Sequence, residues 1–368
     1  MIIKRINLHH LRMTLRSPFE TSFGRFDKRD CILVEAFTKD LVGYGECVAD
    51  RDPGYSYETC ETAWHVLKDF LIPALLEEEI GEPTEIEQQL SFVRGHQMAK
   101  AGLEMAFWDL QGKQEGRCLR ELLGGESERV AVGVSIGIQD SPAHLVKSVF
   151  GYLALGYSRV KIKIKPGRDT IDTQAVRGEF PDLPLQVDAN SAYTLATASA
   201  LQPLDELGLL LIEQPLADDD LWDHSKLQAQ FETPICLDES ILSARHARQA
   251  IEMDACRVVN IKVGRVGGLS QALAIHDLCQ ERGIPVWCGG MLETGVGRAA
   301  NLALASLPNF KLPGDISATD RYYAQDITEQ RFTLNADSTI HVPDAPGLGV
   351  TIDPRALECV TVKRTSIP

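Results

Sequence analysis

The sequence predicts an α/β fold, a (β/α)8-type (TIM-like) barrel with an α+β capping domain. From residue 131 onward, short runs rich in apolar and β-branched residues alternate with helical stretches. Eight such runs occur, at residues 131–138, 159–164, 185–190, 209–215, 235–240, 258–264, 284–290 and 312–317. Near-continuous apolar strands that alternate with helices are typical of parallel βα units buried on both faces. Eight units in succession predict a closed barrel.

The last of these runs is the weakest, because Pro313 and Gly314 interrupt its strand pattern. An open, doubly wound sheet is the alternative fold for alternating strands and helices. The Gly-rich turn that binds dinucleotides in such sheets is absent from the sequence, which favours the barrel.

The chain holds more than a barrel, since its 368 residues exceed the roughly 250 that a barrel alone needs. We expect the catalytic barrel over residues 126–318. Residues 1–125 predict the first part of an α+β capping domain, including a long helix over residues 98–116. Residues 319–368 return to short strands, and we expect this segment to rejoin the capping domain.

Composition indicates the environment and the kind of partner. The net charge of −15 argues against nucleic acid or an anionic membrane as a partner. No apolar run approaches the roughly 18 residues of a membrane span, and no secretory leader opens the sequence. The nine cysteines include no CxxC pair, which favours free thiols in a reducing cytoplasm. We therefore expect a cytoplasmic protein that acts on a small molecule, and a homo-oligomer.

The polar residues that close the central strands recur at a regular interval. They are Lys163, Asp188, Glu213, Asp238 and Lys262, separated by 25, 25, 25 and 24 residues. In barrel enzymes the carboxyl ends of the strands carry the chemistry. A single acid at such a position is often the N-cap of the next helix. Three on consecutive strands, with a lysine on each side, instead predict a catalytic site.

The three acids predict a metal site. Asp188, Glu213 and Asp238 close neighbouring strands, so their carboxylates converge and repel one another unless a cation lies between them. Hard oxygen ligands favour Mg²⁺, with Mn²⁺ as a substitute. The sequence holds no HExxH motif and no Cys/His cluster, which argues against zinc.

The two lysines predict proton transfer. Lys163 and Lys262 close strands four apart in a barrel of eight, and therefore lie on opposite sides of its mouth. A substrate carboxylate on the metal would place its α-carbon between the two amines, which suits proton exchange through an enediolate. We expect a lowered pKa for the base Lys163 from burial, the metal and Lys161. Lys161 tunes the base or contacts the bound carboxylate, whereas Lys165 lies in the solvated loop.

These residues resemble the enolase superfamily, in its muconate-lactonising subgroup. The shared motifs are Lys161-Ile-Lys163, Asp188-Ala-Asn190, Glu213-Gln-Pro215, Asp238-Glu-Ser240 and Lys262, with GYGE (43–46) and PGLGV (346–350) near the two ends. In that family the second lysine of the pair and the later lysine are the acid/base residues. The resemblance further implies that the three acids bind Mg²⁺ and that a capping domain covers the barrel mouth.

Within the subgroup, the chain is similar to the o-succinylbenzoate synthases that also racemise N-succinyl and other N-acyl amino acids. Residues 17–24, 94–110, 134–138, 288–299 and 312–317 carry this similarity. It implies dehydration in menaquinone biosynthesis, and it implies substrate contacts from Phe19, Phe23, Tyr55, Ser135, Lys161, Asn190, Met291 and Ile316. Arg265 resembles an arginine associated with racemase activity, and its alternative is a surface loop residue or a phosphate-free ion pair. Phe19 and Phe23 have ordinary domain packing as their alternative.

Other functions share this catalytic core. A muconate cycloisomerase or a dipeptide epimerase would need the same lysines and acids. Such epimerases usually hold the substrate ammonium with an Asp-x-Asp pair near the eighth strand, and here Asp315 and Asp320 are five residues apart. A non-enzymatic metal-binding scaffold would need the acids but not two opposed lysines. The sequence leaves open whether synthase or racemase activity is the physiological one.

Overall fold

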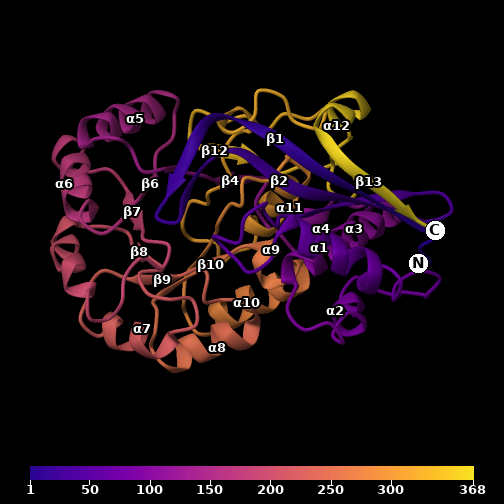
Figure 1. The fold of residues 1–368 in the computed structure, drawn as a ribbon, viewed down its shortest axis with the longest axis horizontal. Coiled ribbons are helices and arrows are strands. Elements are labelled where there is room, and N and C mark those ends of the chain that lie inside the picture. The colour runs from indigo at the N-terminus through magenta and orange to yellow at the C-terminus, as the bar shows by residue number, and fades with distance from the viewer.

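The computed structural model describes residues 1–368 and has a parallel seven-stranded sheet at the centre of its larger domain (Figure 1). Its strands are β5 (Val134–Ile136), β6 (Val160–Lys163), β7 (Leu185–Asp188), β8 (Ile212–Glu213), β9 (Ile235–Leu237), β10 (Val258–Ile261) and β11 (Val286–Cys288). They lie in sequence order across the sheet, and every neighbouring pair is parallel. Every residue of these seven strands is buried. The sheet curls into the predicted barrel type.

Helices follow every strand of the sheet and cover its outside, with two of them after β10 (Figure 1). They are α5 (Pro142–Ala154), α6 (Asp169–Glu179), the 3-10 helix η2 (Ala198–Leu207), α7 (Leu221–Gln228), α8 (Ala244–Glu252), α9 (Val263–Val266), α10 (Leu269–Glu281) and α11 (Gly295–Ala305). Polar side chains begin several of them: Ser141, Asp220, Ser243 and Thr294 each accept a hydrogen bond from a backbone N–H of the first turn. Such caps satisfy N–H groups that have no partner within the helix.

The predicted eighth strand at residues 312–317 is wrong as a strand. Pro313 has no N–H to donate to a ladder, and the segment forms only isolated bridges. It still lies between the two edges of the sheet. The Gly314 N–H donates to the Ala131 carbonyl (3.0 Å), and the Asp315 N–H donates to the Cys288 carbonyl of β11 (2.8 Å). An irregular segment therefore closes the ring.

The smaller domain is an antiparallel sheet with helices packed on it, and we call it the cap. Its strands, in spatial order, are β13 (Thr361–Ile367), β1 (Arg5–Thr21), β2 (Gly24–Phe37) and β3 (Val42–Cys47). Its helices are α1 (Cys60–Val66), the π-helical turn η1 (Leu67–Leu71), α2 (Glu85–Gln89), α3 (Gln97–Glu115) and α4 (Leu119–Leu123). The long helix α3 packs on β3 and also reaches α9 of the barrel domain.

The C-terminal segment contacts both domains. β12 (Thr339–His341) pairs with β4 (Arg129–Ala131), and α12 (Pro354–Val360) leads into β13, which pairs with β1. A short 3-10 turn, η3 (Thr319–Arg321), precedes them. Both termini lie at the far end of the cap (Figure 1). The boundaries after residues 125 and 318 stay a prediction.

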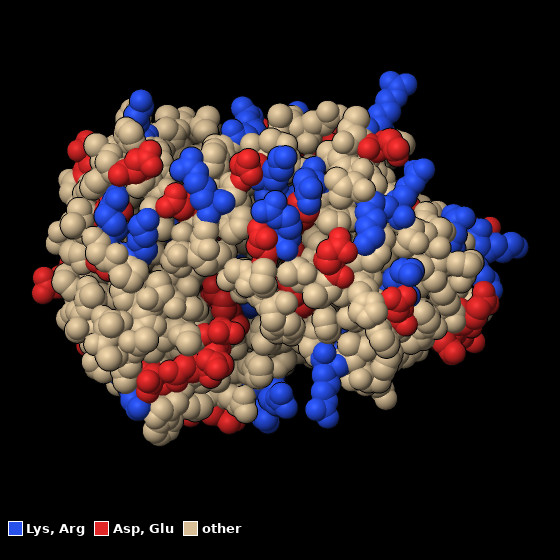
Figure 2. Space-filling view, viewed as in Figure 1, with Lys and Arg blue, Asp and Glu red and all other residues tan.

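The charged surface and the cysteines are distributed as follows. Figure 2 shows acidic and basic side chains interspersed over much of one face, with a band of acidic side chains from its centre toward the lower left. Eight of the nine cysteines are buried free thiols, and Cys359 is exposed. No helix combines the length and the apolar character that a membrane crossing requires.

Candidate active site

The five polar residues at the strand ends lie side by side at one rim of the sheet. Lys163, Asp188 and Glu213 are the last residues of β6, β7 and β8, and they are register partners in turn. Asp238 and Lys262 directly follow β9 and β10. Because the strands are parallel and in sequence order, the interval of about 25 residues places all five at the same level.

The three acids form a compact buried cluster. One carboxylate oxygen from each of Asp188, Glu213 and Asp238 lies within 4.8 Å of the others, and all three residues have no exposed surface. Buried carboxylates this close repel one another unless positive charge lies beside them. Their donor set is oxygen only, which fits a hard divalent cation such as Mg²⁺ or Mn²⁺.

Burial and the surrounding cations shift the pKa values of the three acids in opposite directions, and the balance differs from acid to acid. Burial raises the pKa of Glu213 well above its usual value, and the Asp188 carboxylate adds to this. Burial also raises the pKa of Asp188, but Lys163 and Lys161 together outweigh it, so that this pKa lies below its usual value. At Asp238 the effect of burial is likewise outweighed by Lys262 together with Arg265, and the pKa is lowered. Glu213 is therefore the acid whose charge is least compensated.

Lys163 and Lys262 approach the cluster from its two ends. The Lys163 ammonium donates to Asp188 (2.6 Å) and to the Asn190 side chain (2.7 Å). The Lys262 ammonium donates to Asp238 (2.7 Å) and to the Tyr55 hydroxyl (3.1 Å). Three strands, β7 to β9, separate β6 from β10 in the sheet. The two ammonium groups therefore flank the carboxylates.

Two buried lysines of the site have raised pKa values. Burial lowers the pKa of Lys262, but the Asp238 carboxylate and the other acidic groups around it together outweigh burial and hold the pKa above its usual value. For Lys161, burial is outweighed by Asp315 and Glu213, and the pKa is raised well above its usual value. The cause is the uncompensated negative charge of the neighbouring carboxylates.

Lys161 lies deeper than Lys163, as its position in β6 predicts, and has an acid partner that the sequence reasoning missed. It is 2% exposed against 8% for Lys163. Its ammonium lies 2.6 Å from Asp315, 2.8 Å from Glu213 and 3.2 Å from Asp188. Asp315 also pairs with buried Arg159 (2.7 Å), which precedes β6. The spacing of Arg159, two residues before Lys161, was a signal for this network.

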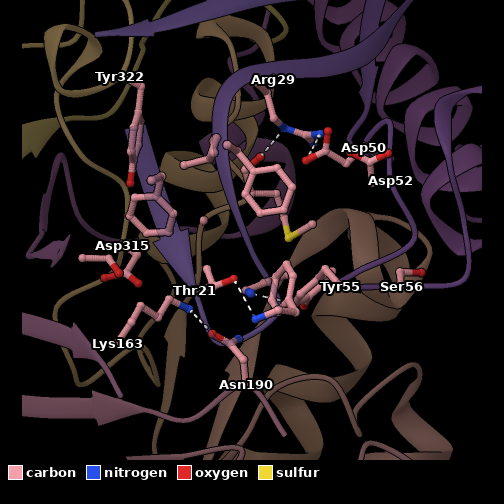
Figure 3. A pocket seen from close by; sticks show the side chains of 18 of the residues that line it. Thr21, Arg29, Asp50, Asp52, Tyr55, Ser56, Lys163, Asn190, Asp315 and Tyr322 are labelled. Atoms are coloured by element: carbon pink, nitrogen blue, oxygen red, sulfur yellow. Dashed lines mark hydrogen bonds and ion pairs between the residues drawn. The ribbon is translucent and has the colours of Figure 1, made fainter. Parts of the chain in front are cut away.

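A cavity of about 820 Å³ opens above the lysines, between the barrel and the cap (Figure 3). Most of the predicted substrate contacts line it, namely Phe19, Phe23, Tyr55, Ser135, Lys161, Asn190 and Met291, together with Lys163 and Lys262. Figure 3 shows Lys163 and Asn190 at one end and the Arg29–Asp50 pair at the other. Phe26, Met98, Leu292 and Tyr322 add apolar surface. The cavity therefore has lysines at its floor, and its walls combine apolar side chains with the charged groups of Arg29, Asp50, Asp52 and Glu58.

Two predicted residues do not line this cavity. Ile316 is 2% exposed and packs in the barrel core. Arg265 lies behind Lys262 and lines a smaller neighbouring cavity with Tyr55. It is 2% exposed, donates to the Ile241 carbonyl (2.8 Å) and pairs with Asp238. Arg265 is thus a buried partner of the Lys262–Asp238 pair and not a surface loop residue.

Several further residues support the site without having been predicted. Asn260 donates to Glu213 (2.7 Å), and its place two residues before Lys262 on β10 was a usable signal. Gln214 accepts from the Asp238 N–H (2.9 Å) and orients that loop. Burial, with Asp238 next, raises the pKa of Glu239 to about 8. Arg29 of the cap donates to the Met291 carbonyl (2.9 Å), a long-range contact that no local pattern reveals.

A capped barrel with three clustered carboxylates between two buried lysines defines a class of proteins that bind a divalent metal and exchange protons beside a carboxylate. Residues 4–124 match the family model for the mandelate racemase / muconate lactonizing enzyme N-terminal domain. Residues 144–356 match the enolase C-terminal domain-like family model. The chain belongs to the mandelate racemase / muconate lactonizing enzyme family of the enolase superfamily.

Known relatives match over essentially the whole chain. An o-succinylbenzoate synthase of Geobacillus stearothermophilus is 52% identical over 360 residues, which cover 98% of this chain and 96% of the relative. An N-succinylamino acid racemase of Amycolatopsis sp. is 49% identical over 368 residues and all of both chains. A solved enolase superfamily member from Listeria innocua has a TM-score of 0.96 at 42% identity, covering 100% of this chain and 99% of the other.

Proposed function

We propose that this protein is an o-succinylbenzoate synthase that also racemises N-succinyl and other N-acyl amino acids. One observation carries the proposal: Lys163 and Lys262 flank three buried carboxylates at the floor of a cavity between the barrel and the cap. A relative named as an o-succinylbenzoate synthase, at 52% identity, and another named as an N-succinylamino acid racemase, at 49% identity, support it. Asp188, Glu213 and Asp238 would hold Mg²⁺, or Mn²⁺ in its place.

When bound, the divalent cation supplies positive charge that stabilises negative charge on the substrate carboxylate. It would also offset the carboxylates that now raise the pKa of Lys262. The chain's own residues then divide the work. Lys163 and Lys262 reach the α-carbon from opposite faces, while Lys161 keeps its paired charge beside the cluster.

Racemisation requires both lysines. One amine takes the α-proton from one face, and the ammonium on the other side returns a proton to the opposite face. Dehydration requires proton removal at one face only. Lys163 removes the α-proton and then protonates the departing hydroxyl, which leaves as water and gives the aromatic product. Lys262 meanwhile remains an ammonium and stabilises the developing negative charge.

The cavity walls favour an acyl group over a free ammonium. Phe19, Phe23 and Met291 provide apolar contact for the acyl chain and an apolar side chain. Dipeptide epimerases usually hold the substrate ammonium with an acid pair near the eighth strand. Asp315 lies in that region of this chain, but it is already paired with Arg159 and Lys161. This pairing argues against turnover of dipeptides and of free amino acids.

We also propose the wider setting of this activity. The substrate is a small-molecule carboxylate, and neither nucleic acid nor a membrane is a partner, because the net charge is −15. The protein is a homo-oligomer of the cytoplasm, and its dehydration product serves menaquinone biosynthesis.

The test is a direct comparison of substrates with the purified, Mg²⁺-supplied protein. We expect dehydration of the cyclohexadiene carboxylate that carries a succinyl side chain, and racemisation of N-succinyl amino acids with apolar side chains. Free amino acids and dipeptides should turn over little. Fast dipeptide epimerisation without any dehydration would leave the family core intact and overturn this assignment.

A further inference from the structure

The segment that follows Lys262 is a short rigid unit. Lys262 is the N-cap of the single-turn helix α9, and its carbonyl accepts from the Val266 N–H (3.1 Å). The Gly268 N–H donates back to the Val263 carbonyl (3.0 Å). Gly268 is in turn the N-cap of α10, with φ of 133°. A displacement of the Gly268–Leu269 bend would therefore also move Lys262, because a single hydrogen-bonded turn connects the two.

The cap packs closely against residues 263–268 at Gly264 and Gly268. A Cβ on Gly264 would lie 2.1 Å from Val48 of the cap, and a Cβ on Gly268 would lie 2.0 Å from the Glu104 carboxylate. Both distances are far below van der Waals contact, so only glycine permits the approach. Packing of the cap against this segment thus explains Gly264 and Gly268.

Glu104 makes the polar part of this contact. It lies in α3 of the cap and is 3% exposed. One carboxylate oxygen accepts from the Leu269 N–H, and the other accepts from the Ser270 N–H (2.9 Å). These are the first two N–H groups of α10, which have no partner inside the helix. Burial raises the pKa of Glu104 to about 7, so this position is costly for a carboxylate and is held by these bonds.

We propose that Glu104 is a positioning residue for Lys262: through the Gly268–Leu269 bend it fixes where the Lys262 amine stands relative to the substrate α-carbon. This inference rests on the proposed function. It assigns to the cap a role in one of the two proton transfers, in addition to covering the cavity. The ammonium of Lys163 bonds to Asp188 and Asn190 of the barrel. The cap reaches this side through the Ser22 hydroxyl, which donates to the Asn190 carbonyl (3.3 Å), and through Glu20, which pairs with Lys165 (3.4 Å).

Glu46 offers a matched control. It belongs to β3 of the cap, is 1% exposed, and also binds the first turn of a barrel helix. It accepts from the Thr294 hydroxyl (2.6 Å) and from the Gly297 N–H (2.9 Å) at the start of α11. The segment that it holds carries no proton-transfer lysine. Glu46→Gln therefore removes a comparable cap–barrel contact away from Lys262.

The experiment measures exchange of the α-proton in deuterated water for each enantiomer of an N-succinyl amino acid. Lys163→Arg and Lys262→Arg first identify which enantiomer depends on which lysine. Glu104→Gln keeps the side-chain volume but leaves only one oxygen for two N–H groups. We expect it to slow exchange at the Lys262-dependent enantiomer about tenfold or more, because small displacements of a reacting group cost this much. Exchange at the Lys163-dependent enantiomer should change little, which also shows that the variant is folded.

Glu46→Gln should leave the ratio of the two exchange rates unchanged, whatever it does to both. Equal slowing of both enantiomers by Glu104→Gln would overturn the inference and leave the proposed function standing. Absence of exchange in the unmodified, metal-supplied protein would instead contradict the proposed function. If Glu104→Gln gives no folded protein, the shorter Glu104→Asp tests the same ratio.

Discussion

The two lysines of the site are held in different ways. The ammonium of Lys163 bonds only to groups of the barrel, Asp188 and Asn190. The ammonium of Lys262 bonds to Asp238 of the barrel and to Tyr55 of the cap. The ammonium of Lys163 is therefore bound by barrel residues alone, whereas the ammonium of Lys262 also contacts the cap. Changes at the cap should act on the Lys262 side first.

Metal removal should produce the largest effect and abolish the difference between the two sides. Excess chelator should eliminate both dehydration and racemisation, and Mg²⁺ or Mn²⁺ should restore them, because the cation held by the three carboxylates would stabilise the negative charge that develops on the substrate carboxylate. Asp238→Asn should weaken metal binding sharply, as measured by calorimetry with Mg²⁺. Full activity in chelator, with no metal by elemental analysis, would contradict the assignment of these acids.

Replacing each lysine in turn should separate the two sides. Lys163→Arg and Lys262→Arg should each lose racemisation by about 10² to 10⁴-fold, the usual contribution of a general acid–base group. Each variant should keep deuterium exchange at the enantiomer that faces its surviving lysine. Lys262→Arg should retain part of the dehydration, since arginine preserves the positive charge, whereas Lys163→Arg should lose it.

The contrary outcome is equally clear. If one lysine variant loses racemisation and the other does not, the two-base arrangement is wrong. Lys165→Arg is a suitable control, because this third lysine of the alternating run is 39% exposed at its side chain and pairs with Glu20 at the rim.

The sequence predicted the barrel and its catalytic floor because both follow from local pattern. Parallel strands in chain order convert a 25-residue interval into neighbouring side chains, so Asp188 and Glu213 become register partners. The eighth strand failed for an equally local reason, the missing N–H of Pro313. By contrast, Asp315 beside Lys161 and Glu104 beside Leu269 join residues more than 150 positions apart. Such contacts depend on how the barrel closes and how the cap packs on it, which no short pattern encodes.

Replacing Arg265 should affect the Lys262 side less than replacing Lys262 itself. It pairs with Asp238, so its removal leaves Lys262 as the main cation beside that carboxylate. We expect Arg265→Ala to slow racemisation about 10- to 100-fold, the value of a hydrogen bond to a charged group. Dehydration should fall less, because it does not need Lys262 to exchange its proton. Steady-state rates of both reactions on one preparation provide the comparison, and equal losses would argue against a role specific to Lys262.

Tyr55 gives the smallest and most specific test of the cap's contribution. Its hydroxyl donates to Asp238 (2.8 Å) and accepts from Lys262 (3.1 Å), and its ring lies 4.4 Å from the Lys262 nitrogen. Tyr55→Phe keeps the ring and removes only the hydroxyl. Since one such hydrogen bond contributes about 1 kcal/mol, exchange at the Lys262-dependent enantiomer should slow about fivefold. Tyr322→Phe is the matched control, because Tyr322 lines the same cavity but does not contact Lys262. If Tyr55→Phe slows both enantiomers alike, the cap closes the cavity without distinguishing the two lysines, and the contrast between the barrel-held and the cap-completed base disappears.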